Sequence, residues 1–328
     1  VPPPTYQPTY SSPPPYVAPC TSTSSAYYET ASSGPPGSCA AAELVYGNQT
    51  VSLPDVSQYR TPGVPGAPSD LVVQGGYAYV ADYCSGLRII DVGDVRHPRE
   101  VASQRSGEAC YGSIALSGGY AYLSSAGVHI VDVRDPLHPV EVGKFDPQTC
   151  GEGLYPTVWD AAVKGTTLFA AAGSGGLALA DITDPGNPVE TACVHYGDNI
   201  SAGDVVVDDR DYAYVADQQT GLWIIDARDP RAPSILGHWV DTTVEFMGEY
   251  VTGITVSGRT AYVLRGLAFQ VLDVTEPTLP RAIGCCPGCA AWNVMDYEGL
   301  IYASASESGL RVWDLSAPMA ARSIGTSE

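Results

Sequence analysis

Three carboxylates are the first candidates for chemistry in this chain. Asp70, Asp160 and Asp204 each precede a short run of apolar residues. Hard cations such as Ca²⁺ prefer oxygen ligands, so three such carboxylates around a narrow axis could gather one. Asp also caps backbone amides readily at the start of a strand, and this alternative is open. The corresponding residues in other stretches of the chain are Ser113, Gly253 and Asn293.

Cysteines form the second group of candidates. The cluster Cys285-Cys286-Pro-Gly-Cys289 contains a Cys-x-x-Cys pair, a spacing that can hold zinc or perform redox chemistry. No second Cys-x-x-Cys and no paired His accompanies it, and Ala290 stands where covalent haem attachment needs His. Structural disulfides are the main interpretation, and a zinc or redox site is the alternative.

The remaining cysteines also favour disulfides. Cys84 and Cys110 fall in loops that we expect on one face of the molecule, where they can pair. The other candidates are Cys20, Cys39 and Cys150. The chain has nine cysteines, so at least one is unpaired or bonded to another chain, and Cys20 is the first candidate for that bond.

The sequence contains no recognisable catalytic constellation. Its five His are scattered, and Gly-x-Ser-x-Gly, His-Glu-x-x-His and phosphate-loop motifs are missing. We therefore expect a protein that is not an enzyme and needs no cofactor, apart from the Ca²⁺ considered above. Trp159 and Trp292 could stack on a sugar near the proposed axis, although packing between blades is the commoner reason for such residues.

A repeated phrase supplies the elements that position these residues. The pattern Gly-Leu-x-Ile-Ile-Asp-Val recurs six times, and its Asp stands at six places that are 41 to 49 residues apart: 91, 132, 181, 226, 273 and 314. A period in that range indicates a propeller or a solenoid. A Gly stands five residues before this Asp in five repeats, where we expect a tight turn with positive φ.

Each repeat divides into four short strands. In the first repeat we expect strands at 71–74, 77–82, 87–92 and 99–104, separated by Gly- and Pro-containing turns. The second strand is apolar on both faces, as expected for a sheet packed between two others. The sequence therefore predicts an all-β fold, a six-bladed β-propeller of four-stranded blades over residues 67–328.

These repeats resemble those of the LVIVD-repeat proteins, a family of bacterial and archaeal secreted or cell-surface proteins. The resemblance covers about residues 67–328 and rests on six copies of the phrase. It implies a β-propeller, but it implies little about activity, because the family shares no catalytic motif.

The chain before the repeats has a different composition. Residues 1–42 are rich in Pro, Ser, Thr and Tyr, which predicts an extended, low-complexity arm. Residues 43–66 contain an additional strand or hairpin around Gly47-Asn48, followed by a Pro/Gly linker. We expect the arm and this strand to pack on a neighbouring subunit, because strand addition to an open sheet edge is a common mode of docking.

Composition restricts the partners. The formal net charge of −20 argues against nucleic acid, whose phosphates are bound by Lys and Arg. No apolar run is long enough to span a membrane. The chain begins at Val1 rather than Met, so we expect that a leader has been removed. Asn48 and Asn199 begin glycosylation sequons.

Together these features predict a secreted or cell-surface protein without enzymatic activity. We expect it to self-associate through its N-terminal arm and strand, forming a homo-oligomer, a filament or another surface assembly. The alternative is a glycan- or cation-binding adhesion module that uses the face around the channel mouth.

Overall fold

The structure is a computed structural model. It describes residues 42–46, 49–53, 68–148 without 106 and 108, residue 150, 157–240, 251–287 without 266 and 267, and strands at 293–297, 300–305, 309–314 and 322–326. All regular elements within these ranges are β-strands, arranged in six antiparallel sheets. The N-terminal arm, Cys289 and Trp292 lie outside the described residues.

Each repeat forms one sheet, and we number the sheets as blades 1 to 6 in chain order. Blade 1 consists of β3 (Asp70–Gln74), β4 (Tyr77–Ala81), β5 (Leu87–Asp91) and β6 (Arg99–Gln104). Blade 2 consists of β7 (Ile114–Ser117), β8 (Tyr120–Ser125), β9 (Gly127–Asp132) and β10 (Val140–Phe145). Blade 3 consists of β11 (Asp160–Lys164), β12 (Thr167–Ala171), β13 (Leu177–Asp181) and β14 (Val189–Val194).

The second half of the chain repeats this order. Blade 4 consists of β15 (Ala202–Val207), β16 (Tyr212–Asp217), β17 (Gly221–Asp226) and β18 (Ser234–Trp239). Blade 5 consists of β19 (Val251–Ser257), β20 (Thr260–Arg265), β21 (Ala268–Asp273) and β22 (Arg281–Pro287). Blade 6 contains β23 (Asn293–Tyr297), β24 (Leu300–Ala305), β25 (Gly309–Asp314) and β26 (Arg322–Thr326).

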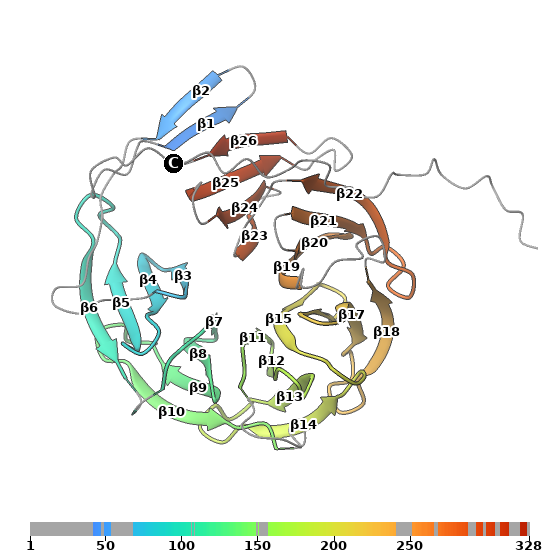
Figure 1. The fold of residues 1–328 in the computed structure, drawn as a ribbon. Helices are drawn as coiled ribbons and strands as arrows, with labels where there is room; N and C mark the ends of the chain where they lie inside the picture. The colour runs from blue at the N-terminus through green and yellow to red at the C-terminus, as the bar shows by residue number, and fades with distance from the viewer. Residues whose placement is uncertain are drawn as a thin grey trace, which may run out of the picture.

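The blades stand around a common axis, as in a propeller (Figure 1). The first strand of each blade lies nearest the axis and the fourth lies on the outside. Because the strands of a blade are antiparallel neighbours, the loops between second and third strands share one face with the connections between blades. We call this face the channel-mouth face.

Strand β8 shows why the inner strands are apolar on both sides. Ala121 and Leu123 belong to a buried cluster that blades 1 and 2 share, whereas Tyr122 belongs to a cluster shared with blade 3. Successive side chains of a strand point to opposite faces, so one strand supplies both seams. Similar clusters join blades 3 and 4 and blades 4 and 5. Full burial of a Leu side chain contributes roughly 1.5–3 kcal/mol, and these seams therefore hold successive blades together.

The recurring Gly and Asp are structural, as predicted. Gly86 has φ of 96°, and a Cβ added to it would lie 2.4 Å from the carbonyl oxygen of Gln104. A side chain there would be both strained and in collision. The Asp of the repeated pattern accepts a hydrogen bond from the amide two residues later. For example, the amide of Gly93 donates to the carboxylate of Asp91 at 3.0 Å. In the repeats whose side chains are described, these residues therefore shape turns.

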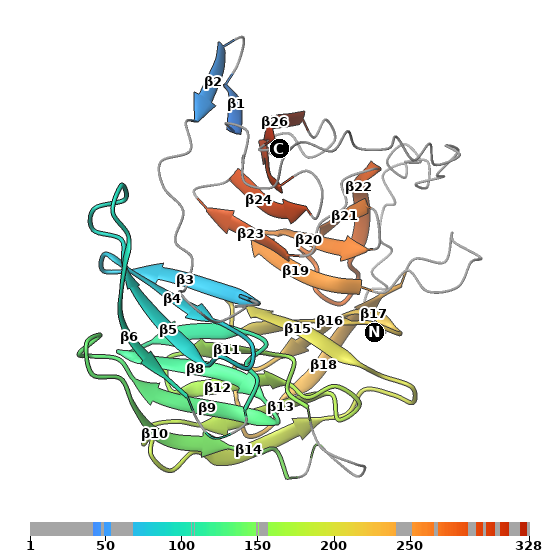
Figure 2. The same cartoon turned by 60° about the vertical axis from the view of Figure 1, so that its left-hand side comes forward.

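A hairpin from the N-terminal side extends blade 6. Strands β1 (Ala42–Tyr46) and β2 (Gln49–Leu53) form the predicted hairpin, and β1 pairs with β26 through Glu43 with Thr326 and Leu44 with Gly325. Figures 1 and 2 both show the hairpin beside β26 at the outside of the ring. The segment therefore adds to a sheet edge, but here the edge belongs to the same chain.

Candidate functional site

The three carboxylates predicted at the channel mouth join neighbouring blades. The Oδ2 atom of Asp70 accepts a hydrogen bond from the amide of Ile114 in blade 2 at 2.9 Å. In the same way Asp160 and Asp204 accept from the first strand of the blade that follows each of them. Blade 2 is joined to the next blade by a different contact. The hydroxyl of Ser124 donates a hydrogen bond to the carbonyl oxygen of Trp159, in the connection into blade 3, at 3.0 Å.

Burial changes the protonation of these carboxyls. Burial, followed by the charge and hydrogen bond of Asp160, raises the pKa of Asp204 well above its ordinary value. Asp204 therefore loses its proton at a higher pH than an ordinary Asp, and the bound proton can be donated in the hydrogen bond to Asp160. Burial also raises the pKa of Asp70 to about 6. Among the described residues, no group of three or more His, Cys, Asp or Glu is arranged to hold a metal ion. These contacts favour the capping alternative, and the Ca²⁺ site remains a prediction.

Two disulfides stabilise the channel-mouth face. Cys84 and Cys110 are bonded, the pair that the sequence suggested for blade 1. Cys150 is bonded to Cys193, which the sequence analysis had not included among the candidates. Their separation of 43 residues is close to one repeat, which is the signal that could have revealed the pair.

Of the other cysteines predicted to form disulfides, two lie within the described residues. Cys285 and Cys286 belong to β22, where their backbones pair with Gln270 and Phe269. Cys20 and Cys39, like Cys289, lie outside the described residues, so their pairing stays a prediction.

A pocket opens on the channel-mouth face where blades 1, 2 and 3 meet. Its volume is about 590 Å³, within the range of roughly 300–1,000 Å³ typical of small-molecule sites. Two large aromatic residues line it, Tyr83 from blade 1 and Trp159 from the connection into blade 3, and each is 51% exposed. The other lining residues are Ala109, Cys110, Gly112, Ser124, Ser125, Ala126, His129, Lys144, Thr157 and Val158. We call this cavity the Tyr83–Trp159 pocket.

Ion pairs orient the polar side of the pocket. His129 and Lys144 face each other across β9 and β10. The Nδ1 atom of His129 lies 2.7 Å from a carboxylate oxygen of Glu141, and the ammonium of Lys144 lies 2.6 Å from Asp146. Each of these groups therefore has an acidic partner, so neither is left to attract an acidic ligand.

Comparison with known proteins identifies the repeat. Models of the LVIVD repeat match residues 65–104, 106–147, 157–195 and 201–241. The chain belongs to the LVIVD-repeat family. No curated protein matches this LVIVD-repeat protein.

Solved structures support the propeller-like arrangement. A protein from Lactobacillus plantarum is 10% identical, with a TM-score of 0.71 over 87% of this chain and 95% of that one. The periplasmic gluconolactonase of Pseudomonas aeruginosa is 14% identical, with a TM-score of 0.69 over 88% of this chain and 95% of that one. At such identities the likeness establishes the fold alone, and the neighbours include enzymes.

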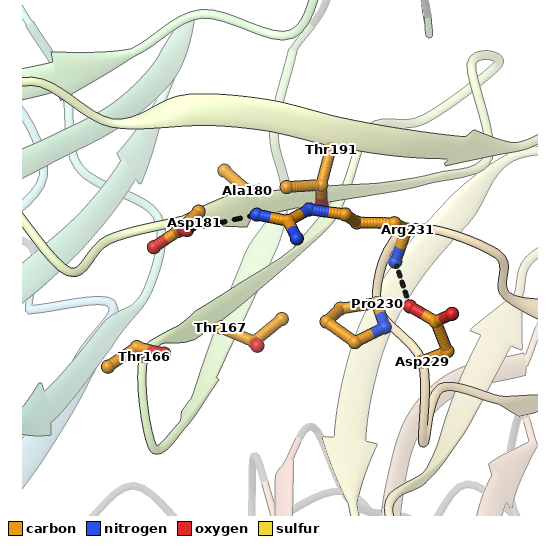
Figure 3. Close-up of a pocket in the computed structure, with 8 residues that line it drawn as sticks. All are labelled: Thr166, Thr167, Ala180, Asp181, Thr191, Asp229, Pro230 and Arg231. Atoms are coloured by element: carbon orange, nitrogen blue, oxygen red, sulfur yellow. Dashed lines mark hydrogen bonds and ion pairs between the residues drawn. The ribbon is translucent and has the colours of Figure 1, made fainter.

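The LVIVD-repeat protein has a second, smaller cavity on the opposite face, between blades 3 and 4 (Figure 3). There Arg231 extends toward Asp181, with 3.9 Å between their closest nitrogen and oxygen atoms, while its backbone amide donates to Asp229 at 3.0 Å. The cavity measures about 220 Å³, below the usual size of a ligand pocket. It joins two blades and is the weaker candidate site.

One of the two predicted glycosylation sites lies within the described residues. Asn199 is exposed, with φ of 56°, in the connection between blades 3 and 4. A sugar on its side chain would point to solvent without disturbing a strand. Asn48 lies outside the described residues.

Proposed function

We propose that this protein is an extracellular structural protein that self-associates through the segment before its repeats. In this proposal the six sheets close into a six-bladed propeller, and the segment before them reaches a second copy. The observation that carries the proposal is the β1–β2 hairpin, which adds to β26 at the outer edge of blade 6.

The strand pairing favours exchange of the β1–β2 hairpin between copies, because few contacts must be broken to release it. Strands β1 and β2 are paired along their whole length, whereas among the described residues β1 pairs with β26 at two positions. The hairpin can therefore detach from its own β26 without losing its internal pairing. It can then dock on the β26 of a neighbouring copy. Exchange of an identical element between copies is a low-cost route to assembly.

Such a contact would be head-to-tail, because the donor hairpin and the acceptor edge are different surfaces. Contacts of that type produce rings if the rotation closes and filaments if it does not. The disulfides fit an assembly outside the cell, since disulfides persist in oxidising compartments. Within the described residues no helix has the length and hydrophobicity to cross a membrane.

Size measurement and electron microscopy of the full chain and four variants test the proposal. The full chain should form particles larger than a monomer, and a variant lacking residues 1–53 should be monomeric. A variant lacking residues 1–41 retains the hairpin and separates its contribution from that of the arm. Leu44→Pro, which removes an amide donor from β1, should weaken assembly, whereas Leu44→Ala should not. A monomeric full chain would contradict the proposal.

Enzymatic activity is a separate question, because one structural neighbour is a gluconolactonase. The prediction that this chain is not an enzyme rests on the missing catalytic motifs. Hydrolysis of gluconolactone by the purified protein, lost in a variant of the Tyr83–Trp159 pocket, would overturn it.

A further inference from the structure

Tyr83 is an exception to the repeat, and the exception faces the Tyr83–Trp159 pocket. The loop of blade 1 that contains it has a counterpart in blade 3. In both loops the first amide donates to the carbonyl of the glycine four residues later, Asp82 to Gly86 and Ala172 to Gly176. The residue that corresponds to Tyr83 is then Gly173.

This position requires a left-handed backbone. The φ of Gly173 is 53°, and the φ of Tyr83 is 37°. Glycine adopts such angles freely, whereas a bulky residue is strained there, at a cost of about 1–3 kcal/mol. Blade 3 shows that glycine suffices for the turn. Tyrosine at this position is therefore explained by its side chain rather than by the loop.

The surrounding backbone holds Tyr83 in place despite the strain. Its carbonyl oxygen accepts a hydrogen bond from the amide of Tyr111 at 3.0 Å. The next residue, Cys84, is bonded to Cys110, which precedes Tyr111. A disulfide and a backbone hydrogen bond thus fix the loop while the Tyr83 side chain stays half exposed.

The backbone of Trp159 is likewise held by hydrogen bonds. Its amide donates to Ala171 at 2.9 Å, and its carbonyl oxygen accepts from the hydroxyl of Ser124 at 3.0 Å. A Cβ added to Gly173 would lie 3.4 Å from the indole nitrogen, so this glycine leaves room for the ring. Trp159 is rigid at its backbone and remains half exposed at its side chain.

We propose that the Tyr83–Trp159 pocket binds a neutral carbohydrate. The electron-rich face of an aromatic ring attracts the weakly positive C–H groups of a pyranose, and the exposed Trp159 provides such a face. Ser125, Thr157 and His129 line the same pocket and can exchange hydrogen bonds with sugar hydroxyls. The pairing of Lys144 with Asp146 and of His129 with Glu141 favours a neutral sugar over an acidic one. This site does not depend on self-association.

The test uses the full chain on a printed array of neutral and acidic glycans, followed by calorimetric titration with cellotriose, chitotriose, maltotriose and mannotriose. At least one neutral saccharide should bind. Trp159→Ala should weaken that binding tenfold or more, and Tyr83→Gly should weaken it severalfold. Binding to insoluble cellulose and chitin distinguishes a polymer surface from a free oligosaccharide as the source.

Two controls separate loss of binding from loss of folding. Tyr83→Gly places glycine where φ is positive, so its melting temperature should equal or exceed that of the parent protein. Leu137→Ala removes a half-exposed apolar side chain from a turn on the opposite face and should leave binding unchanged. The proposal is overturned if no neutral glycan binds, or if the Trp159 and Tyr83 variants bind like the parent.

Discussion

The carboxylate of Asp160 in blade 3 accepts a hydrogen bond from the amide of Val205 in blade 4, at 3.0 Å. Asp160 also shares a side-chain hydrogen bond with Asp204, which in turn accepts one from the amide of Ile254 in blade 5. A chain of polar contacts therefore runs around the axis beneath the channel-mouth face. It satisfies backbone amides at places where the apolar seams supply no acceptor.

Removing the carboxylate of Asp160 should weaken the junction between blades 3 and 4. We expect Asp160→Ala to lower the free energy of unfolding by about 1–3 kcal/mol, because the Val205 amide loses its acceptor. Asp160→Asn keeps an oxygen acceptor and should cost less. Denaturant unfolding measures the change. Asp198→Ala, at an exposed turn, is the control and should stay within about 0.5 kcal/mol of the parent. Equal losses at the two positions would show that the inter-blade bond is unimportant.

The raised pKa values of Asp70 and Asp204 predict greater stability in mild acid. Both carboxyls hold a proton more tightly in the folded state, so stability falls as pH rises through the interval between the two pKa values of each group. For Asp70 this interval runs from 3.8 to about 6. The pKa values of Asp132 and Asp226 are lowered instead, mainly by hydrogen bonds from Arg134 and Arg228, and their contribution is lost as pH falls below 3.8.

The melting temperature should therefore be highest close to pH 3.8 and should decline as the pH rises to about 6. Scanning calorimetry across that range measures it, and the double variant Asp70→Asn, Asp204→Asn should show a flatter profile above the maximum. A parent protein whose melting temperature rises steadily from acid to neutral pH would contradict the assignment.

Much of the fold could be predicted from the sequence, because the repeat records packing directly. A central strand must be apolar on both faces when its blade packs between two other blades. Tyr122 and Leu123 of β8 show this, because they pack toward blades 3 and 1 respectively. The turn glycines were equally visible, since Gly86 stands where a Cβ would strike the neighbouring strand. Such constraints act within one repeat or between adjacent ones, so they leave a regular pattern.

The Tyr83–Trp159 pocket could not be predicted as a unit. Its walls come from three blades, and only the arrangement of successive blades around the axis places Tyr83 and Trp159 in one pocket. Trp159 was recognised as an aromatic residue near the mouth, but Tyr83 was missed. The available signal was a tyrosine where another repeat has Gly173. The partner of Cys150 was also missed, although Cys193 lies 43 residues away, close to the length of one repeat.

Loss of the Cys84–Cys110 bond should destabilise blade 1. The bond closes a segment with a sequence separation of 26 residues, and a loop of that size corresponds to about 3 kcal/mol in the chain-entropy account. The double variant Cys84→Ser, Cys110→Ser should lose about that much in denaturant unfolding. Reduction of the parent protein should lower its stability further, because it also opens Cys150–Cys193. A double variant as stable as the parent would contradict this role.

Two glycines of blade 3 allow a matched test of close packing. A Cβ on Gly175 would lie 1.7 Å from the carbonyl oxygen of Cys150, so Gly175→Ala must displace the backbone beside the Cys150–Cys193 disulfide. Gly165 has φ of 60° and no atom within 4 Å of an added Cβ, so Gly165→Ala introduces only backbone strain.

We expect Gly165→Ala to cost about 1–2 kcal/mol and Gly175→Ala about 3 kcal/mol or more. Denaturant unfolding gives the two values, and titration of free thiols reports the disulfide. The Gly175 variant should show more reactive thiol than the parent, and the Gly165 variant should not. If Gly165→Ala were the more damaging substitution, the close approach of blade 3 to the connection that contains Cys150 would be wrong.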